Sequence, residues 1–286
     1  MKKLITLLIL ISLQSCVNSK TLLYSVSDFT TESGFTKGIE GPAVDSKGNL
    51  YAVNYKEEGT IGIVNKNGKS TIYTKLTNGS VGNGIRFDKN DNMYIADYTN
   101  HNILLLKKDS KTPIIYAHNP TMNQPNDIAL APNGTLYASD PNWKDNTGNI
   151  WLIKKGETIL LEKNMGTTNG IEVSPNGKKL YVNESVQKNI WVYDINEDNT
   201  LKNKTLFKTF KDFGLDGMRC DQNGNLFVCR YGKGTIAIIS PQGQLLKEII
   251  LKGKKPSNIT FGGKNNMQCF VTMADRGCFE TFLSHK

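Results

Sequence analysis

The sequence is poor in residues that bind soft metals and in segments that could cross a membrane. Its 286 residues include 3 histidines and 5 cysteines, and the cysteines lack the spacing of a zinc site. The apolar run at residues 4–13 is too short to span a bilayer. No long amphipathic helical pattern and no low-complexity stretch interrupts the remainder. These absences argue against a zinc-selective site, a membrane-spanning helix and a second domain.

The chain also lacks a concentrated basic surface, although its formal net charge is +9. Its lysine pairs, at 107–108, 154–155 and 178–179, fall in separate turns. A nucleic-acid footprint would instead gather on one face and alternate with aromatic residues that stack on bases. Lysines scattered through turns more often keep strand edges from pairing. We therefore expect no nucleic-acid partner.

What the chain has is a repeated turn phrase, first seen as Asp45-Ser-Lys-Gly-Asn-Leu-Tyr. Its six copies begin roughly 43 residues apart, a period typical of propellers. Asn-Gly and Asp-Asn pairs in these copies tolerate the positive φ of two-residue hairpin turns, so strands should flank every copy. Four strands fit each unit, which is the content of one blade. We predict an all-β fold, a six-bladed β-propeller. The copies lie at residues 45–51, 88–94, 131–137, 174–181, 221–227 and 262–268.

The two ends of the repeat array complete each other. The last unit is one strand short, because the chain stops soon after residues 278–283. Residues 21–26 precede the first unit and have no other obvious partner. We predict that this N-terminal strand completes the last blade and closes the ring, which leaves no large unpaired edge. One propeller domain would then occupy residues 21–286.

The first residues have the composition of an export signal. A positive start precedes the apolar run, and Leu13-Gln14-Ser15-Cys16 follows at once. This phrase resembles a bacterial lipobox, in which cleavage leaves the cysteine as a diacylglycerol-modified N-terminus. The alternative is ordinary secretion with cleavage nearby. We predict a signal peptide at 1–15, lipidation of Cys16, a tether at 16–20, and an exported lipoprotein anchored on the periplasmic or cell-surface side of a membrane.

Export would permit disulfides among the remaining cysteines. Simple pairing around the turn at 223–224 places Cys220 opposite Phe227, with Cys229 offset along the same face. A bridge between these two cysteines would need distorted geometry, so we interpret them as small buried thiols. The pattern leaves the state of Cys269 and Cys278 open.

One side chain with a terminal oxygen precedes each turn phrase at the same phase of the repeat. In a ring of equivalent blades, such residues point toward one axis. Two carboxylates with neutral amides make an all-oxygen site suited to Ca²⁺ or Mg²⁺. Opposed carboxylates in a narrow channel repel unless a cation lies between them, whereas amides also serve as strand caps. The set is Glu40, Asn83, Asn126, Asn169, Asp216 and Asn258.

These blades resemble the senescence-marker-protein/gluconolactonase/luciferin-regenerating-enzyme-like family, which is similar in fold to diisopropyl fluorophosphatase and the paraoxonases. The resemblance runs in order through residues 35–275, in phrases such as Glu40-Gly-Pro-Ala-Val-Asp and Leu215-Asp-Gly-Met-Arg-Cys-Asp. It implies hydrolysis of lactones or related esters by one divalent metal in the central channel, with Ca²⁺ most expected and Zn²⁺ or Mg²⁺ as alternatives. The implied metal ligands are Glu40, Asn126, Asn169 and Asp216.

The resemblance also implies catalytic roles. The metal would polarise the substrate carbonyl and stabilise the oxyanion. Asp216 is the implied general base or nucleophile, but a carboxylate bound to a cation is a weak base. Asp127, beside the metal, is the alternative, and a hydrogen-bonded aspartate at a strand start is its other interpretation.

Departures from the family bear on the substrate. Sugar-lactone members carry an arginine where this chain has Gln124, which can still donate a hydrogen bond but carries no charge. Polyhydroxy or anionic lactones should therefore bind less well. Trp143, in a loop, either contacts substrate or only packs. With Gln124 and Trp143, we expect Asn83 and Asn258 to line the substrate site. The alternative function is a membrane-anchored binding module or sensor with a structural metal; in either case we expect a monomer.

Overall fold

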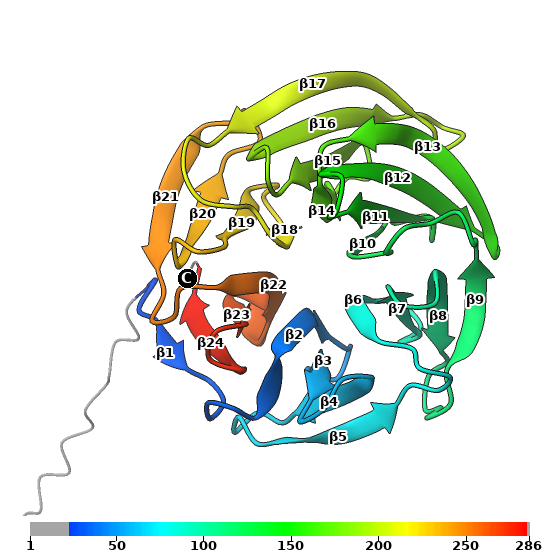
Figure 1. Ribbon diagram of the computed structural model, residues 1–286. Coiled ribbons are helices and arrows are strands. Elements are labelled where there is room, and N and C mark those ends of the chain that lie inside the picture. The colour runs from blue at the N-terminus through cyan, green and yellow to red at the C-terminus, as the bar shows by residue number, and fades with distance from the viewer. Residues whose placement is uncertain (1–22, 285–286) are drawn as a thin grey trace, which may run out of the picture.

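Six four-stranded antiparallel sheets surround a central axis in the computed structural model, which describes residues 23–284 (Figure 1). The strands nearest the axis are β2 (Phe35–Val44), β6 (Gly82–Phe87), β10 (Ile128–Leu130), β14 (Thr168–Val173), β18 (Met218–Cys220) and β22 (Pro256–Gly262). The second strands are β3 (Leu50–Tyr55), β7 (Met93–Asp97), β11 (Leu136–Asn142), β15 (Lys179–Glu184), β19 (Leu226–Arg230) and β23 (Gln268–Met273). The predicted six-bladed β-propeller is confirmed.

The outer half of each blade follows the same order. The third strands are β4 (Thr60–Val64), β8 (Asn102–Leu106), β12 (Thr147–Lys154), β16 (Asn189–Ile195), β20 (Thr235–Ile239) and β24 (Cys278–Leu283). The outermost are β5 (Ser70–Lys75), β9 (Ile114–His118), β13 (Glu157–Met165), β17 (Leu201–Thr209), β21 (Leu245–Ile250) and β1 (Ser27–Asp28). A single-turn 3₁₀ helix, η1 (Lys264–Asn266), lies between β22 and β23. Within residues 23–284 there is no helix long and apolar enough to span a membrane.

The core lies between neighbouring blades rather than in one centre. Val53 of the first blade packs in one cluster with Ile85 and Ile95 of the second. Phe35 of the first blade packs with Phe279 of the last, their rings meeting edge to face. Apolar contact therefore continues across the join of the ring, and the blades hold the axial strands in fixed positions.

An N-terminal strand closes the ring, as predicted. The closing strand is β1, in which Ser27 pairs with Thr281 and Asp28 with Glu280. It begins after the predicted residues 21–26, although the Tyr24 N–H also donates to the Leu283 carbonyl (2.9 Å). Arg276 Nη1 holds the Asp28 carboxylate at 2.7 Å. The predicted signal peptide and Cys16 lie outside the described residues, as do Thr21 and Leu22.

The hairpin at 221–225 corrects the predicted pairing of the cysteines. Cys220 pairs with Leu226 rather than Phe227, which instead faces Arg219. The loop holds three residues instead of two, because the Asp221 N–H bonds the Asn225 carbonyl and Gly224 takes the left-handed conformation (φ 81°). The longer loop shifts the register by one residue. The four cysteines among the described residues are free thiols, and Cys220 is the one that is not fully buried.

Candidate functional site

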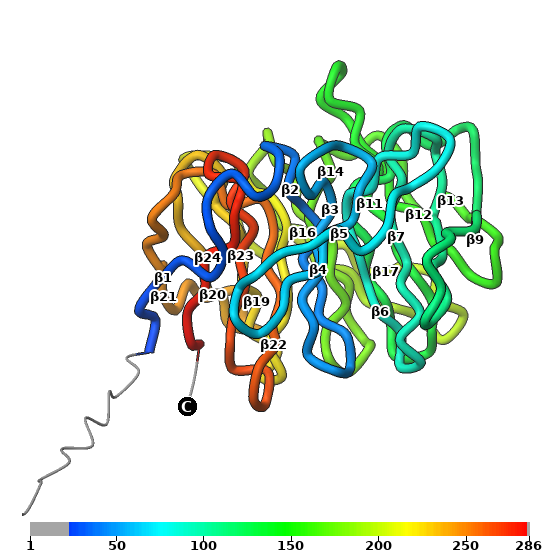
Figure 2. The backbone as a smooth tube through the Cα atoms, turned by 90° about the horizontal axis from the view of Figure 1, so that it is seen from below, coloured from blue at the N-terminus to red at the C-terminus, as the bar shows by residue number. Residues whose placement is uncertain are grey.

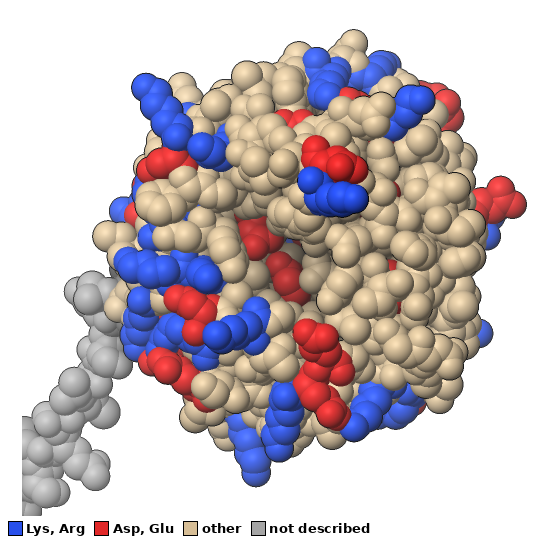
Figure 3. Space-filling model, in the orientation of Figure 1, with Lys and Arg blue, Asp and Glu red and all other residues tan. Residues whose placement is uncertain are grey.

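A cavity of about 690 Å³ opens at one end of the central channel. Figure 3 looks onto this face, where carboxylates are visible in the central hollow. We call the opposite end, where the repeated turn phrases lie, the turn end. Five of the six predicted oxygen-bearing residues line the cavity, and Asn258 does not. The five, one from each of five successive blades, are Glu40, Asn83, Asn126, Asn169 and Asp216.

These side chains leave the strands at points where regular pairing is interrupted. The pairing of β2 with β3 changes register on both sides of Glu40, and that of β14 with β15 changes between Thr168 and Ile171. Asp216 precedes β18, which begins at Met218. A bulge or a late strand start re-aims a side chain that strict alternation would otherwise fix. These residues therefore point toward the axis because the backbone is irregular at the same position in their blades.

Glycines let the blades approach one another at this level. A β-carbon on Gly84 would lie 2.5 Å from Asp127 Oδ1, and one on Gly217 would overlap the Asn258 side chain. Each glycine follows a cavity residue in sequence, Asn83 or Asp216. Without a side chain at these positions, the polar group of the next blade can reach the axis.

Two carboxyl groups, Glu40 and Asp216, line the inner part of the cavity, which we call the cavity floor. Glu40 is buried, and its Oε2 accepts hydrogen bonds from the Gly41 N–H (2.6 Å) and Asn258 Nδ2 (2.9 Å). Burial and the nearby charge of Asp127 raise the pKa of Glu40 to about 8. Burial and the charge of Glu40 also raise the pKa of Asp216 well above its ordinary value. The two carboxylates therefore oppose each other's ionisation without a neighbouring cation.

An amide oxygen on the same floor has no partner. Asn126 Oδ1 is buried without a hydrogen bond, although its backbone carbonyl accepts one from Asn83 Nδ2 (3.0 Å). Such an oxygen costs free energy unless an ion or water satisfies it. Within residues 23–284 no three His, Cys, Asp or Glu side chains are arranged to hold a metal. Two carboxylates completed by the amides of Asn126 and Asn169 nevertheless have the chemistry of a hard-cation site.

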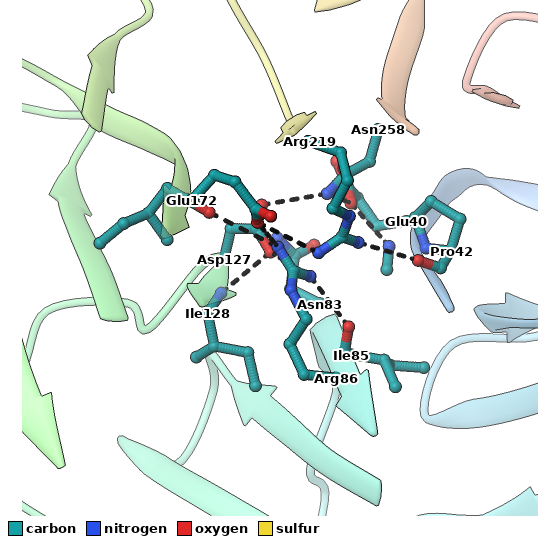
Figure 4. A network of polar contacts seen from close by, with 12 residues as sticks. Glu40, Pro42, Asn83, Ile85, Arg86, Asp127, Ile128, Glu172, Arg219 and Asn258 are labelled. Atoms are coloured by element: carbon teal, nitrogen blue, oxygen red, sulfur yellow. Dashed lines mark hydrogen bonds and ion pairs between the residues drawn. The ribbon is translucent and has the colours of Figure 1, made fainter. Parts of the chain in front are cut away.

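A network of ion pairs crosses the channel beneath this floor (Figure 4). Arg86 contacts Asp127 Oδ1 (3.2 Å) through Nη1 and Glu172 Oε2 (3.3 Å) through Nη2. Arg219 contacts the same Glu172 oxygen (3.5 Å) and donates to the Pro42 carbonyl (3.1 Å). Both guanidinium groups are buried. We call Arg86, Asp127, Glu172 and Arg219 the channel network.

The channel network divides the channel into two cavities. A second cavity of about 620 Å³ opens at the turn end and is lined by Arg86, Glu172 and Arg219. The two cavities share no lining residue. Sequence reasoning missed these three residues. The signal was present, because each follows an axial residue by three positions and places a charge in a mostly apolar strand.

The remaining predicted residues lie at different depths. Gln124 and Trp143 line the cavity, and Trp143 is 44% exposed on the loop between β11 and β12. Figure 2 shows this loop, in green, projecting beyond its neighbours at the top. Asp127 and Asn258 are buried below the cavity, where Asn258 Nδ2 lies 2.9 Å from Glu40 Oε2 and 3.3 Å from Asp127 Oδ2.

Comparison with known proteins agrees with this geometry. The family described as SMP-30/gluconolactonase/LRE-like region matches residues 38–275. A gluconolactonase of Zymomonas mobilis is 29% identical over 64% of this chain, a match that spans 58% of that enzyme's length. The diisopropyl-fluorophosphatase of Loligo vulgaris is 27% identical over 82% of this chain and 85% of its own.

Solved structures show the same fold. A luciferin-regenerating enzyme superposes with a TM-score of 0.77 at 21% identity, covering 91% of this chain and 95% of its own. A calcium-binding regucalcin from Agrobacterium tumefaciens gives 0.75 at 19% identity, covering 88% and 94%. With the family match spanning all six blades, the chain belongs to the SMP-30/gluconolactonase/LRE-like family.

Proposed function

We propose that this protein is a metal-dependent hydrolase of lactones or related esters. The observation that carries the proposal is the cavity floor, where Glu40 and Asp216 converge with the unpartnered Asn126 oxygen. Relatives named gluconolactonase and diisopropyl-fluorophosphatase support a hydrolytic role. A purely structural polar channel would be expected to satisfy its buried groups internally.

Four residues would hold the metal: Glu40, Asn126, Asn169 and Asp216. Their oxygens fit Ca²⁺ first, with Mg²⁺ or Zn²⁺ as alternatives. When bound, a divalent ion supplies Lewis-acid polarisation of the substrate carbonyl and charge for the developing oxyanion. Asn169 is fixed by the hydrogen bond from its Nδ2 to Ser185 Oγ (3.0 Å).

We assign proton transfer to Asp216 rather than to Asp127. Asp216 lines the cavity, so its carboxylate can take a proton from an attacking water. Both Asp127 oxygens are already engaged, Oδ1 by Arg86 and the Ile128 N–H (2.9 Å) and Oδ2 by Asn258. In this proposal Asp127 positions Asn258, which in turn holds Glu40.

The two neutral amide side chains, Asn83 and Gln124, have different proposed roles. Asn83 Nδ2 donates a hydrogen bond to the Asn126 backbone carbonyl, so in this proposal Asn83 orients the segment that carries Asn126. Gln124 lines the cavity, and its backbone N–H is fixed by Asp140 Oδ1 (2.7 Å). Its side-chain amide is therefore the proposed hydrogen-bond donor to a neutral oxygen of the substrate.

The test combines metal analysis of purified protein with a panel of lactones and aryl esters. We expect a bound divalent ion and hydrolysis that Asp216→Ala lowers roughly 10²–10⁴-fold, the usual contribution of a general base. Glu58→Gln, which removes an exposed carboxylate at the cavity mouth, is the matched control and should retain activity. Metal without hydrolysis would favour a binding module or sensor. Absence of metal, or full activity in Asp216→Ala, would remove the proposal.

We also propose that the protein is exported and anchored through lipidated Cys16. Support comes from the sequence alone, in the positive start, the apolar run and the lipobox-like phrase. Cys16→Ala should release the protein from the membrane fraction in its native host. Unchanged fractionation would contradict the anchor.

A further inference from the structure

Exposed large apolar side chains have two locations among the described residues. Nine lie on the outermost strands β5, β9, β13, β17 and β21. The other three lie in loops, and all three line the cavity proposed as the active site. They are Trp143, Val186 and Phe213, exposed by 44%, 47% and 49%. We call these three the apolar rim.

The apolar rim comes from three separate loops. Trp143 lies between β11 and β12, Val186 between β15 and β16, and Phe213 between β17 and β18. Buried Leu215 and Ile39 also line the cavity. Apolar surface therefore continues from the mouth toward the floor that carries Glu40.

Phe213 is held in place rather than hanging free. Its backbone adopts a positive φ of 44°, which is unfavourable for a bulky side chain and persists where the surroundings impose it. Its ring lies over Gly232, where a β-carbon would come within 3.3 Å of Phe213 Cδ1. Gly232 thus provides the space in which the aromatic ring is seated at the mouth.

The acidic floor does not suit an anionic substrate, and the apolar rim does not suit a heavily hydroxylated one. No arginine lines the cavity among the described residues, and Lys37, Lys188 and Glu58 are the charges at its mouth. The floor is itself acidic. Hydroxyl groups placed against the apolar rim would lose hydrogen bonds to water without replacement.

We propose that the apolar rim selects neutral lactones or esters that carry an apolar alkyl or aryl substituent. The ester group lies over the floor, and the substituent runs outward across Trp143, Val186 and Phe213. This inference rests on the proposed hydrolase function and names its substrate class. A cavity of about 690 Å³ has room for both parts of such a molecule.

The first experiment compares γ-lactones whose side chain grows from hydrogen to hexyl, with gluconolactone alongside. We expect kcat/KM to rise roughly fourfold for each methylene that the rim buries, and to level off once the chain extends beyond it. Gluconolactone should be the poorer substrate. Preference for gluconolactone over the alkyl lactones would overturn the proposal.

Matched variants locate the effect. Val186→Ser and Phe213→Asn remove apolar surface, and asparagine tolerates the positive φ at position 213. Both should flatten the chain-length dependence, measured within each variant as the ratio of kcat/KM for the hexyl lactone to kcat/KM for unsubstituted γ-butyrolactone. Leu206→Ser, on outer strand β17 and 53% exposed, is the control and should keep the full dependence. An equal effect of Leu206→Ser would overturn the assignment to the rim.

A binding measurement separates this inference from the hydrolase proposal. 2-Alkylcyclopentanones present a carbonyl and a chain but no ester, and their affinity can be measured by calorimetry. Affinity that rises with chain length, and less so in Phe213→Asn, supports the rim even if no lactone is hydrolysed. Hydrolysis without chain-length dependence would leave the hydrolase proposal standing and overturn the rim.

Discussion

Both halves of the central channel carry charged residues from the axial strands or the segments just before them, but only one half pairs these charges with one another. On the turn side of the floor, two guanidinium groups and two carboxylates pair within the channel network. On the cavity side, no lysine or arginine among the described residues forms an ion pair with Glu40 or Asp216. The Asn126 Oδ1 atom accepts no hydrogen bond there. One half is electrostatically complete, whereas the other requires something from solution. This contrast, more than axial position alone, marks a functional site.

The network is expected to be structural because its charges compensate one another. Removing one member of a buried ion pair leaves the other charge uncompensated, whereas the intact pair contributes little net free energy. The cavity residues should behave in the opposite way. Removing one of their charges should relieve repulsion in the absence of metal and weaken metal binding in its presence.

The largest effect should follow from breaking the channel network. Arg86→Met leaves Asp127 and Glu172 without their shared guanidinium, so the free energy of unfolding should fall by about 3–5 kcal/mol. Urea denaturation measures the change. Lys179→Met, which removes an exposed pair with Asp194, is the control and should cost at most about 1 kcal/mol. Equal losses would mean that the network is no more structural than the surface pairs.

A smaller effect should follow from crowding the boundary between the two halves. In Gly217→Ala the new methyl group would displace Asn258, which links Glu40 to Asp127. We expect a loss of about 1–3 kcal/mol in the free energy of unfolding, together with weaker metal binding. Gly34→Ala, where the nearest atom is 3.6 Å away, controls for the substitution itself. Metal affinity that is unchanged in Gly217→Ala would separate Asn258 from the metal site.

A pH dependence should arise from Glu172. Burial, partly offset by Arg86, raises its pKa from 4.5 to about 7. Because the folded protein holds this proton more tightly than the unfolded chain, the stability from Glu172 is present at low pH. It is lost as the pH rises from about 4.5 to 7. Glu172→Gln should remove about 3 kcal/mol of that decline, measured as the free energy of unfolding at a series of pH values. An identical pH profile in the variant would contradict this role.

The smallest expected effect has the opposite sign. In protein treated with a chelator, Glu40→Gln removes one of two opposed carboxylates while a side-chain oxygen remains for Asn258. The variant should be more stable than wild type by about 1 kcal/mol under these conditions. Asp91→Asn, which removes a half-buried carboxylate that is paired with Lys108 and lies outside the 690 Å³ cavity, is the control and should not be stabilised. If Glu40→Gln were instead less stable than wild type without metal, a positive charge in the cavity half would already compensate Glu40, which would contradict the contrast between the two halves.

The sequence predicts the cavity half better than the rest of the channel. Turn phrases mark each blade, so one phase of the repeat is enough to find Glu40 and Asp216. The network joins Arg86 to Glu172 across 86 residues, and pairing across an axis leaves no local pattern. The predicted hairpin register was wrong at Cys220 because an Asn-Gly pair fits both a two-residue and a three-residue loop. Lipidation at Cys16 stays a prediction.

The most direct test is calorimetric titration of chelator-treated protein with Ca²⁺, repeated for Glu40→Gln and Glu172→Gln. The difference between the two halves predicts one site per chain in the wild type, binding weakened at least tenfold in Glu40→Gln, and near-wild-type affinity in Glu172→Gln. Unchanged affinity in Glu40→Gln, or a loss as large in Glu172→Gln, would contradict the assignment of the metal site to the cavity half.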